Sequence, residues 1–374
     1  VPPLRFPEFT KEWEEHALAE YLDFKNGLNP DVKRIGRGLP FISVMDILAD
    51  GTINYDSIRG KVEATEREIE NFSVEKGDIL FQRSSETLED VGRANVYMDN
   101  RTAVYGGFVI RGRKIGDYNP LFFKYLLSTP LARKRTCRMG AGAQHFNIGQ
   151  GGLSKISLCF PLMEEQNKIA RLLSLIDERI ATQNKIIDKL QSLIKGLRVC
   201  CMQRNGSNNV YLSEIAQIYQ PQTISSAELT EDGFLVYGAN GIIGKYKDYN
   251  HKTEQICITC RGNTCGMVNY TKPMSWITGN AMVINTDKYQ DKVYKKYLYH
   301  YLSAYNFNSI ISGSGQPQIV RTPLEKLKIT LPTISEQKQK AIIFDKIQDK
   351  IDINHKVLNL YIGQKQYLLR QMFI

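Results

Sequence analysis

The sequence of 374 residues lacks the signatures of several protein classes. No apolar run approaches the roughly 20 residues that a helix needs to cross a bilayer, and the N-terminal stretch does not resemble a signal peptide. We therefore expect a cytoplasmic protein with no membrane partner. A phosphate loop is missing too, because Gly241–Lys245 (GIIGK) is too short for the Gly-x4-Gly-Lys-Ser/Thr pattern.

Cysteine is scarce, and the odd number of seven is typical of a reducing compartment. Cys257, Cys260 and Cys265 lie near one another with His251 nearby, which could suggest a zinc site. However, the ICITC segment reads as a β-strand, on which residues three apart point to opposite faces. Without a turn between them, Cys257 and Cys260 could not bind one ion, so we expect structural thiols and no metal.

Acidic residues are outnumbered, with 39 Asp and Glu against 49 Lys and Arg, which leaves a formal net charge of +10. Charge of this kind concerns association rather than fold, and it favours a polyanionic partner such as nucleic acid over a merely solvated basic surface. The chain is long enough for two domains, each with its own core.

One sequence element is present twice. Leu153–Gln203 begins LSKISLCFPLMEEQNKIA and Leu324–Ile374 begins LEKLKITLPTISEQKQKA, and the two align without a gap at an offset of 171 residues. In the second copy, Thr333 and Glu336 fit a helix-starting capping box, for which the first copy lacks the Thr. The repeat predicts a duplicated structural unit. We therefore expect a globule followed by a long helix, and then a second globule followed by a second long helix.

Each copy continues into a heptad pattern that predicts a long helix with one apolar seam. Such a seam must pack against a partner, and the other copy is the obvious one. Lys365 stands where the first copy has Ile194, so that end of the seam could be solvated. The expected helical joint comprises Ile176, Ile180, Gln183, Ile187 and Leu190 of the first helix and Ile347, Ile351, Asn354, Leu358 and Tyr361 of the second.

Gln183 and Asn354 occupy equivalent seam positions. A buried amide is a device that fixes register in coiled coils, although both could instead lie on a solvated flank. If two equivalent helices pack antiparallel, residues near their centre meet their own counterparts. We therefore predict that Gln183 and Asn354 lie close together.

The two globules resemble each other in pattern. An apolar strand is followed by an Arg in each, at Arg83 and Arg261, and an aromatic helix and a glycine-rich loop come later in both. Side chains at these strand ends and loops can bind base edges or phosphates, although salt bridges and tight turns are competing interpretations. The candidates are Arg83, Ser84, Ser85, Gln144, His145, Asn147, Arg261, Asn263, Gln316 and Gln318.

The doubled K-I-x-L-x-x-P-x-x-x-E-Q element, with its heptad helices and preceding globules, resembles the specificity subunit of type I restriction-modification systems. The opening PPLRFPEF, the GSGQPQI loop and the YGANGIIG run (Tyr237–Gly244) are similar to segments of such subunits. The resemblance adds Tyr237, Asn240 and Lys245 to the candidate DNA contacts.

The resemblance implies an α/β (α+β) fold with two target-recognition globules and two long antiparallel helices. The expected divisions are a first recognition domain at 1–152, a first strand-helix spacer at 153–205, a second recognition domain at 206–323 and a second spacer at 324–374. Each domain would read one half of a split DNA sequence, and the helices would hold the domains apart.

The implied partners are double-stranded DNA, two methyltransferase subunits and the restriction subunits. This chain would hold no cofactor and catalyse nothing; S-adenosylmethionine, and ATP with Mg for cleavage, would bind the partners. One alternative is a stand-alone DNA-binding regulator or scaffold. Another is an adenine methyltransferase, since Asn119–Phe122 (NPLF) nearly matches the Asn-Pro-Pro-aromatic motif. That enzyme needs a glycine-rich cofactor strand that we do not find, and Asn-Pro more simply starts a helix.

Overall fold

The computed structural model describes residues 1–202, 208–239, 241–313 and 315–374. The chain forms two compact units, of which unit 1 comprises residues 1–184 and 357–374, and unit 2 comprises residues 185–356. Unit 2 is therefore continuous in sequence, whereas unit 1 contains both termini. Asn240 lies outside the described residues.

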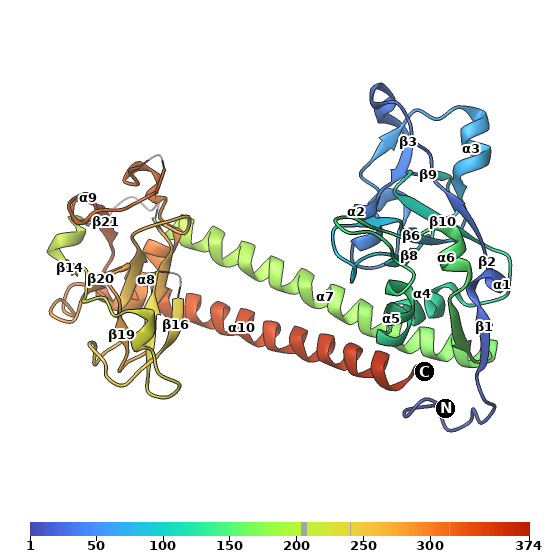
Figure 1. The fold of residues 1–374 in the computed structure, drawn as a ribbon. Coiled ribbons are helices and arrows are strands. Elements are labelled where there is room, and N and C mark those ends of the chain that lie inside the picture. Colours follow the sequence, from blue (N-terminus) through green and yellow to red (C-terminus); the bar gives the residue numbers. More distant parts are fainter. Residues whose placement is uncertain (203–207, 240, 314) are drawn as a thin grey trace. The chain divides into compact units, whose positions relative to one another are not determined.

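The centre of unit 1 is a four-stranded antiparallel sheet in the order β2-β10-β6-β8 (Figure 1). Its middle strand β6 is buried on both faces: Ile79 and Phe81 pack into one cluster, and Leu80 packs into another. Alternation along a strand produces this division, so β6 separates two cores. The strands are β2 (Leu22–Asn26), β6 (Ile79–Gln82), β8 (Ala94–Val96) and β10 (Val109–Lys114).

A second sheet in unit 1 has the order β4-β3-β9-β5, and its β3–β9 pair is parallel. The strands are β3 (Ile35–Ile42), β4 (Lys61–Val62), β5 (Ser73–Val74) and β9 (Ala103–Tyr105). Shorter elements complete the unit: β1 (Glu14–Ala17), α1 (Leu18–Tyr21), η1 (Val32–Arg34), α2 (Val44–Leu48), η2 (Tyr55–Ser57), α3 (Glu66–Phe72), β7 (Ser84–Ser85), α4 (Pro120–Ser128), α5 (Pro130–Cys137), β11 (Phe146–Asn147), α6 (Gln150–Ser154) and β12 (Ser157–Phe160).

Unit 2 repeats this plan, except that its second sheet has three strands in place of four. Its central antiparallel sheet has the order β14-β20-β17-β18, and its second sheet, β16-β15-β19, contains the parallel pair β15–β19. The elements are β13 (Asn208–Tyr211), η3 (Leu212–Glu214), β14 (Gln217–Tyr219), η4 (Ser226–Glu228), β15 (Phe234–Gly238), β16 (Gly241–Tyr246), β17 (Ile256–Thr259), β18 (Val268–Tyr270), β19 (Trp276–Ile277), β20 (Ala281–Asn285), α8 (Lys295–Ala304), η5 (Phe307–Ser309), α9 (Arg321–Glu325) and β21 (Lys328–Leu331).

The central strand β17 separates two cores, as β6 does. Cys257 belongs to one buried cluster and Cys260 to the other, so the predicted opposite orientation of these thiols is confirmed. Burial in an apolar environment raises the pKa of the Cys257 thiol. Among the described residues, no group of three or more His, Cys, Asp or Glu side chains could hold a metal ion.

The two repeat copies form the helices α7 (Met163–Met202) and α10 (Ile334–Gln371). Within unit 1, the first part of α7 and the end of α10 contribute to one apolar cluster, with Leu173, Leu368 and Met372 among its members. Within unit 2, Ile194 of α7 packs with Phe344 and Ile351 of α10. All ten residues predicted for the joint are buried or half-buried, as a seam requires.

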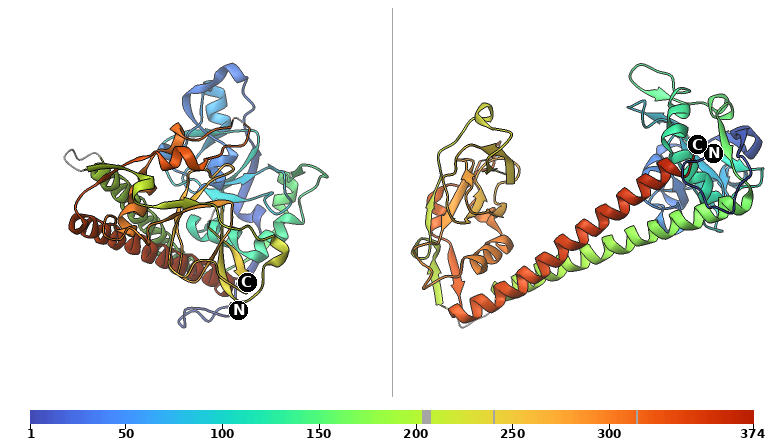
Figure 2. Two further views of the ribbon diagram at one scale, coloured as in Figure 1. Left: turned by 90° about the vertical axis from the view of Figure 1, so that its left-hand side faces the viewer. Right: turned by 90° about the horizontal axis from the view of Figure 1, so that it is seen from below.

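The expectation of a solvated seam end at Lys365 is wrong. Its ammonium lies 2.6 Å from the Asp177 carboxylate and sits over the Tyr125 ring, and Leu368 and Met372 beyond it are buried. The seam therefore continues to the end of α10, where Gln371 accepts a backbone hydrogen bond from Leu4 and the two chain termini lie close together (Figure 2). Ion pairing compensates for the charge at the seam.

The repeated Gln of the two copies performs the same task in each unit. Gln166 accepts from the backbone N–H of Asn119 at 3.0 Å and donates to the Pro161 carbonyl, which ties the start of α4 to the start of α7. Gln337 likewise accepts from Tyr294 at 2.8 Å and donates to Pro332. A buried amide that satisfies two backbone groups is costly to replace, which explains why this Gln is present in both copies.

The repeated Glu performs different tasks. Glu336 forms the predicted capping box with Thr333, whose side chain and backbone N–H both bind its carboxylate. Glu165 is buried and receives two hydrogen bonds from the Arg5 guanidinium, at 2.7 Å each. The first copy lacks the Thr, and a charged pair with the N-terminal segment takes its place. No helix in the described part of the chain is long and apolar enough to span a membrane.

Candidate nucleic-acid interface

In unit 1, three segments meet at the end of the central strand β6. Arg83, which follows β6, donates its backbone N–H to Phe108 and accepts at its carbonyl from Ile148, both at 2.9 Å. Ser84 and Ser85 then pair with Asn147 and Phe146 as the strands β7 and β11. We call these segments the first corner: the strand end Arg83–Ser85, the turn Gly106–Val109 and the loop Ala141–Ile148.

Unit 2 builds an equivalent arrangement, the second corner. Cys260 donates its backbone N–H to Asn280 at 3.3 Å and accepts from Ile319 at 3.0 Å. Arg261 then forms a bridge with Gln318. The second corner comprises the strand end Cys260–Asn263, the turn Thr278–Ala281 and the loop residues 315–319. Both corners thus bring together the strand ends and glycine loops that the sequence indicated separately.

The strand pairing shows that Arg83 and Arg261 are not equivalent positions. Gln82 faces Val109 in one central sheet and Thr259 faces Ala281 in the other. Arg83 therefore corresponds to Cys260, and Arg261 corresponds to Ser84. Because neighbouring strand residues point to opposite faces, the two guanidinium groups leave their corners in different directions. The Arg83 side chain is half-buried and reaches the Gly107 carbonyl at 3.4 Å, whereas Arg261 is exposed.

The glycine loops owe their glycines to their own tight turns. Gly142 and Gly313, equivalent at the repeat offset, both have positive φ, +142° and +90°. A Cβ would overlap the carbonyl oxygen of His145 in the first loop and of Gln316 in the second. Of the two interpretations, the tight turn thus accounts for these glycines. The polar side chains presented by the turns are exposed: Gln144, His145, Asn147, Gln316 and Gln318.

The remaining candidates differ in accessibility. Asn263 is exposed, and Ser84 and Ser85 are half-buried, with the Ser84 hydroxyl bound to the Asn147 side chain. Lys245 is half-buried on β16, 3.4 Å from the Asp232 carboxylate. Tyr237 needs correction: it is 6% exposed in a core cluster, and its hydroxyl accepts from the Lys272 backbone, so its side chain is not available to a ligand. The aromatic residue of the YGANG run serves packing.

Two exposed residues of the corners were missed in the sequence. Phe108 is 68% exposed in the first turn, and Asn280 is exposed in the second. The available signal was a Gly followed by one residue between two β-rich runs, GGFVI in one globule and TGNAM in the other. That pattern predicts a turn, but nothing local indicates that the turn lies beside the strand end.

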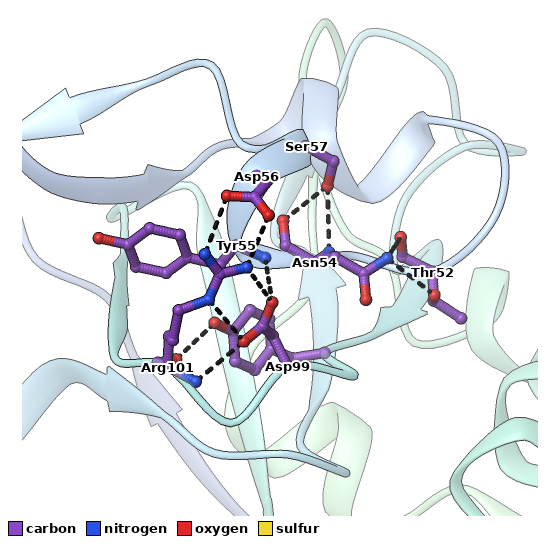
Figure 3. A network of polar contacts seen from close by, with 8 residues as sticks. Thr52, Asn54, Tyr55, Asp56, Ser57, Asp99 and Arg101 are labelled. Atoms are coloured by element: carbon purple, nitrogen blue, oxygen red, sulfur yellow. Dashed lines mark hydrogen bonds and ion pairs between the residues drawn. The ribbon is translucent and has the colours of Figure 1, made fainter.

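The strand β9, which leads into the first turn, is fixed at its start by a polar network (Figure 3). Arg101 donates to Asp56 at 2.9 and 2.7 Å and to Asp99 at 3.1 and 2.8 Å, and its guanidinium lies over the Tyr55 ring. Hydrogen bonds from Arg101 hold the pKa of both carboxyl groups below the usual range. The network fastens the η2 loop to the β8–β9 connection.

The comparisons with known proteins agree with this duplicated architecture. The family model described as "Type I restriction modification DNA specificity domain" matches residues 10–192 and again residues 205–360. The chain belongs to this family of DNA specificity proteins.

The curated relatives of this specificity protein are themselves specificity subunits. It is 25% identical to a putative type I restriction enzyme MjaX specificity subunit of Methanocaldococcus jannaschii, over 93% of this chain and 90% of that protein. It is 31% identical over 140 residues to the EcoprrI specificity subunit of Escherichia coli, which covers 36% of this chain and 34% of that protein.

Solved structures share the fold of this specificity protein. An S subunit of a type I restriction-modification system from M. genitalium superposes with a TM-score of 0.69 and 17% identity, over 100% of this chain and 99% of that one. A chain from a study of complex assembly of the type I R-M system has a TM-score of 0.58 and 14% identity, over 97% of both chains. The two globules and two long helices are thus a fold that this family shares.

The near-match to a methyltransferase motif in this specificity protein is a helix cap. The Asn119 side chain accepts from the backbone N–H groups of Leu121 and Phe122 at 3.0 and 3.1 Å, and Pro120 occupies the first turn of α4. This confirms the simpler interpretation, in which Asn-Pro starts the aromatic helix. The Asn119 side chain therefore has a structural task at the start of α4.

Proposed function

We infer that this specificity subunit reads a two-part DNA sequence, with one corner for each half. The observation that carries this function is the corner built twice, from the same three segments with the same backbone hydrogen bonds, but with different side chains. One scaffold with two sets of reading groups suits two half-sites of different sequence. The net charge of +10 supplies the sequence-independent affinity for phosphates.

The helices α7 and α10 are the elements that set the distance between the half-sites in this proposal. A helix of 40 residues such as α7 is about 60 Å long at about 1.5 Å per residue. When two reading elements are joined by a rigid spacer, half-site spacing on DNA becomes a geometric consequence of the spacer. The seam packing of both helices within each unit supports that rigidity.

Two methyltransferase subunits and the restriction subunits are the partners that we propose besides double-stranded DNA. Outside their seams, the long helices leave large apolar side chains exposed in each unit, and we propose that the partner subunits bind there. Unit 1 exposes Leu175, Leu360 and Tyr367, and unit 2 exposes Leu193, Ile343 and Ile353. The proposal leaves catalysis, S-adenosylmethionine, and ATP with Mg to these partners. A solved relative comes from a study of complex assembly, which supports such a role.

The test is to sequence methylated adenines in DNA from cells that carry this chain with its partner subunits. We expect a bipartite motif with a constant gap. Arg261→Ala should weaken methylation or relax base choice only in the half-site read by unit 2, by about 1–3 kcal/mol for a bidentate contact. Lys288→Ala, an exposed cation in the same unit beyond the far end of β20, is the matched control for lost charge.

A motif without two parts would contradict the proposed function. An unchanged pattern in Arg261→Ala would remove that residue from the interface. The stand-alone regulator remains the alternative function, and copurification with methyltransferase subunits distinguishes the two. Methyl transfer by the isolated chain would instead identify an enzyme.

A further inference from the structure

The turns of the two corners are equivalent residue by residue. Gly106–Val109 and Thr278–Ala281 each close through a hydrogen bond from the fourth residue to the first, at 2.9 and 3.0 Å. The first residue of each turn also donates to the preceding parallel strand, and the third accepts from the residue that follows the central strand. These contacts are Gly106 to Ile42, Thr278 to Tyr237, Arg83 to Phe108 and Cys260 to Asn280. Phe108 and Asn280 therefore occupy one structural position.

Both turns are rigid at this position. The second residue is glycine in each, and a Cβ there would overlap the Asn29 side chain at Gly107, or Thr223 and the Pro221 carbonyl at Gly279. The turn backbone is thus packed against a neighbouring loop on one side and hydrogen-bonded to the strand end on the other. The side chain of the third residue extends from a fixed backbone, a requirement for reading a base at a defined position.

The position of Phe108 and Asn280 beside the candidate DNA contacts, and not their exposure alone, indicates a role in recognition. A single exposed apolar residue is common on protein surfaces and needs no explanation. Phe108, however, is adjacent through its carbonyl to Arg83, and Arg83 is bonded in turn to the glycine loop at Ile148. The turn therefore contacts the strand end, and the strand end contacts the glycine loop, both of which carry candidate DNA contacts.

The two side chains differ in what they can recognise. Phe has no hydrogen-bonding group, and in the major groove it suits the C5-methyl group of thymine. Asn can bind adenine through a bidentate pair with N6 and N7. We propose that Phe108 and Asn280 are equivalent specificity-determining residues, which select a thymine methyl group in the first half-site and an adenine in the second. This inference rests on the proposed function.

The first experiment measures binding of the complex with its methyltransferase partners to duplexes that carry its methylation motif. Uracil replaces thymine at each position of a half-site in turn, which removes one methyl group. We expect one uracil in the first half-site to weaken binding about fourfold, close to the contribution of one buried methyl group. Phe108→Ala should bind more weakly and lose this sensitivity, and Phe108→Leu should keep part of it.

The second experiment applies the same logic to Asn280. Replacing adenine by 7-deazaadenine removes the N7 acceptor and should weaken binding at one position of the second half-site. Asn280→Ala should abolish that sensitivity and leave the uracil response of the first half-site unchanged. Each variant is thus the control for the other, and melting temperatures close to that of the unchanged chain verify that both fold.

The inference is overturned if the motif is bipartite but Phe108→Ala and Asn280→Ala respond to every modified base as the unchanged chain does. In that case, the proposed function stands and only the turn assignment falls. A motif without two parts overturns the proposed function, and the turn assignment falls with it.

Discussion

At the residue scale, one corresponding position binds the recognition globule to the helices in each unit. Tyr125 of α4 donates to Asp177 of α7 at 2.8 Å, and Asp177 also binds Lys365 of α10. In unit 2, the equivalent aromatic helix places His300 between Asp345 of α10 and Arg198 of α7. Each unit therefore ties its aromatic helix and both long helices together with a polar bridge, in which the aromatic-helix residue is buried and the charged residues are half-buried.

The bridge at His300 requires a neutral imidazole. Nδ1 lies 2.8 Å from the Arg198 guanidinium and must accept from it, and Nε2 donates to Asp345 at 3.0 Å. Chiefly because of burial, the pKa of His300 falls from its usual value near 6.5 to about 4. In the unfolded chain, this His takes up a proton near pH 6.5, whereas the native protein resists until about pH 4. The contribution of His300 to the free energy of unfolding is therefore fully present above pH 6.5 and is lost as the pH falls toward 4.

We accordingly expect His300→Gln to flatten the pH dependence of unfolding. The unchanged chain should lose up to about 3 kcal/mol between pH 6.5 and pH 4 from this group, at about 1.36 kcal/mol per pKa unit. Urea unfolding at pH 7 and pH 5 measures the difference. His355→Gln, at an exposed position of α10, is the control. Parallel pH profiles for His300→Gln and the unchanged chain would contradict the expectation.

At the element scale, the two amides of the seam are half-buried or buried. Gln183 is 8% exposed, and Asn354 is half-buried and donates to the Lys350 carbonyl one helical turn back, at 2.6 Å. Neither amide therefore lies on a solvated flank of the helices. The hydrogen bond along α10 already satisfies one donor of the Asn354 side chain. The pairing of Gln183 with Asn354 stays a prediction.

If the amides pair, replacing both with Leu should be tolerated or stabilising, and each single replacement should cost more. The single changes leave one buried amide without its partner, at about 1–3 kcal/mol. Melting temperatures of the two single variants and the double variant measure the coupling. The double change should also loosen the register of the joint, which would appear as a blurred gap in the methylation motif. Additive effects with a sharp gap would show that the two amides act independently.

At the scale of the whole molecule, neither compact unit is made from one half of the sequence. Unit 1 takes residues 357–374 from the second repeat, and unit 2 takes residues 185–202 from the first. The end of α10 completes the core beneath the first globule, where Leu368 and Met372 are buried. The end of α7 packs against the start of α10 in unit 2, where Ile194 contacts Phe344 and Ile351. The first globule together with its own helix α7 therefore lacks part of its core.

This exchange predicts that a half-chain ending at Asn205 dimerises. In the dimer, the α7 end of a second copy would replace the missing α10 end, with Leu197 where Leu368 packs. Two-fold symmetry then covers one apolar stripe with another. Sedimentation should show a dimer, and the half-chain should bind a symmetric version of the first half-site. A stable monomer that binds no DNA would contradict the exchange.

The sequence by itself determined the repeat, the seam, the helix starts and the family. These features depend on local periodicity and capping. A seven-residue repeat predicts the seam, and an Asn-Pro or Thr-x-x-Glu signal predicts a helix start. The strand ends and glycine loops of the candidate interface were legible for the same reason. Arg83 and Arg261 both follow an apolar strand, yet they occupy non-equivalent positions, because similar residues after a strand do not define the pairing register.

Only the tertiary structure decided how those segments meet. Pairing of β6 with β10 and of β17 with β20 determines which residues lie opposite each other. It brings Phe108 next to Arg83, 25 residues away along the chain, and Asn280 next to Cys260, 20 residues away. The burial of Tyr237 and the ion pair of Lys365 with Asp177 likewise depend on neighbours distant in sequence. Such long-range contacts cannot be predicted from the local sequence pattern, because tertiary packing, and not the spacing of residues along the chain, determines which residues meet.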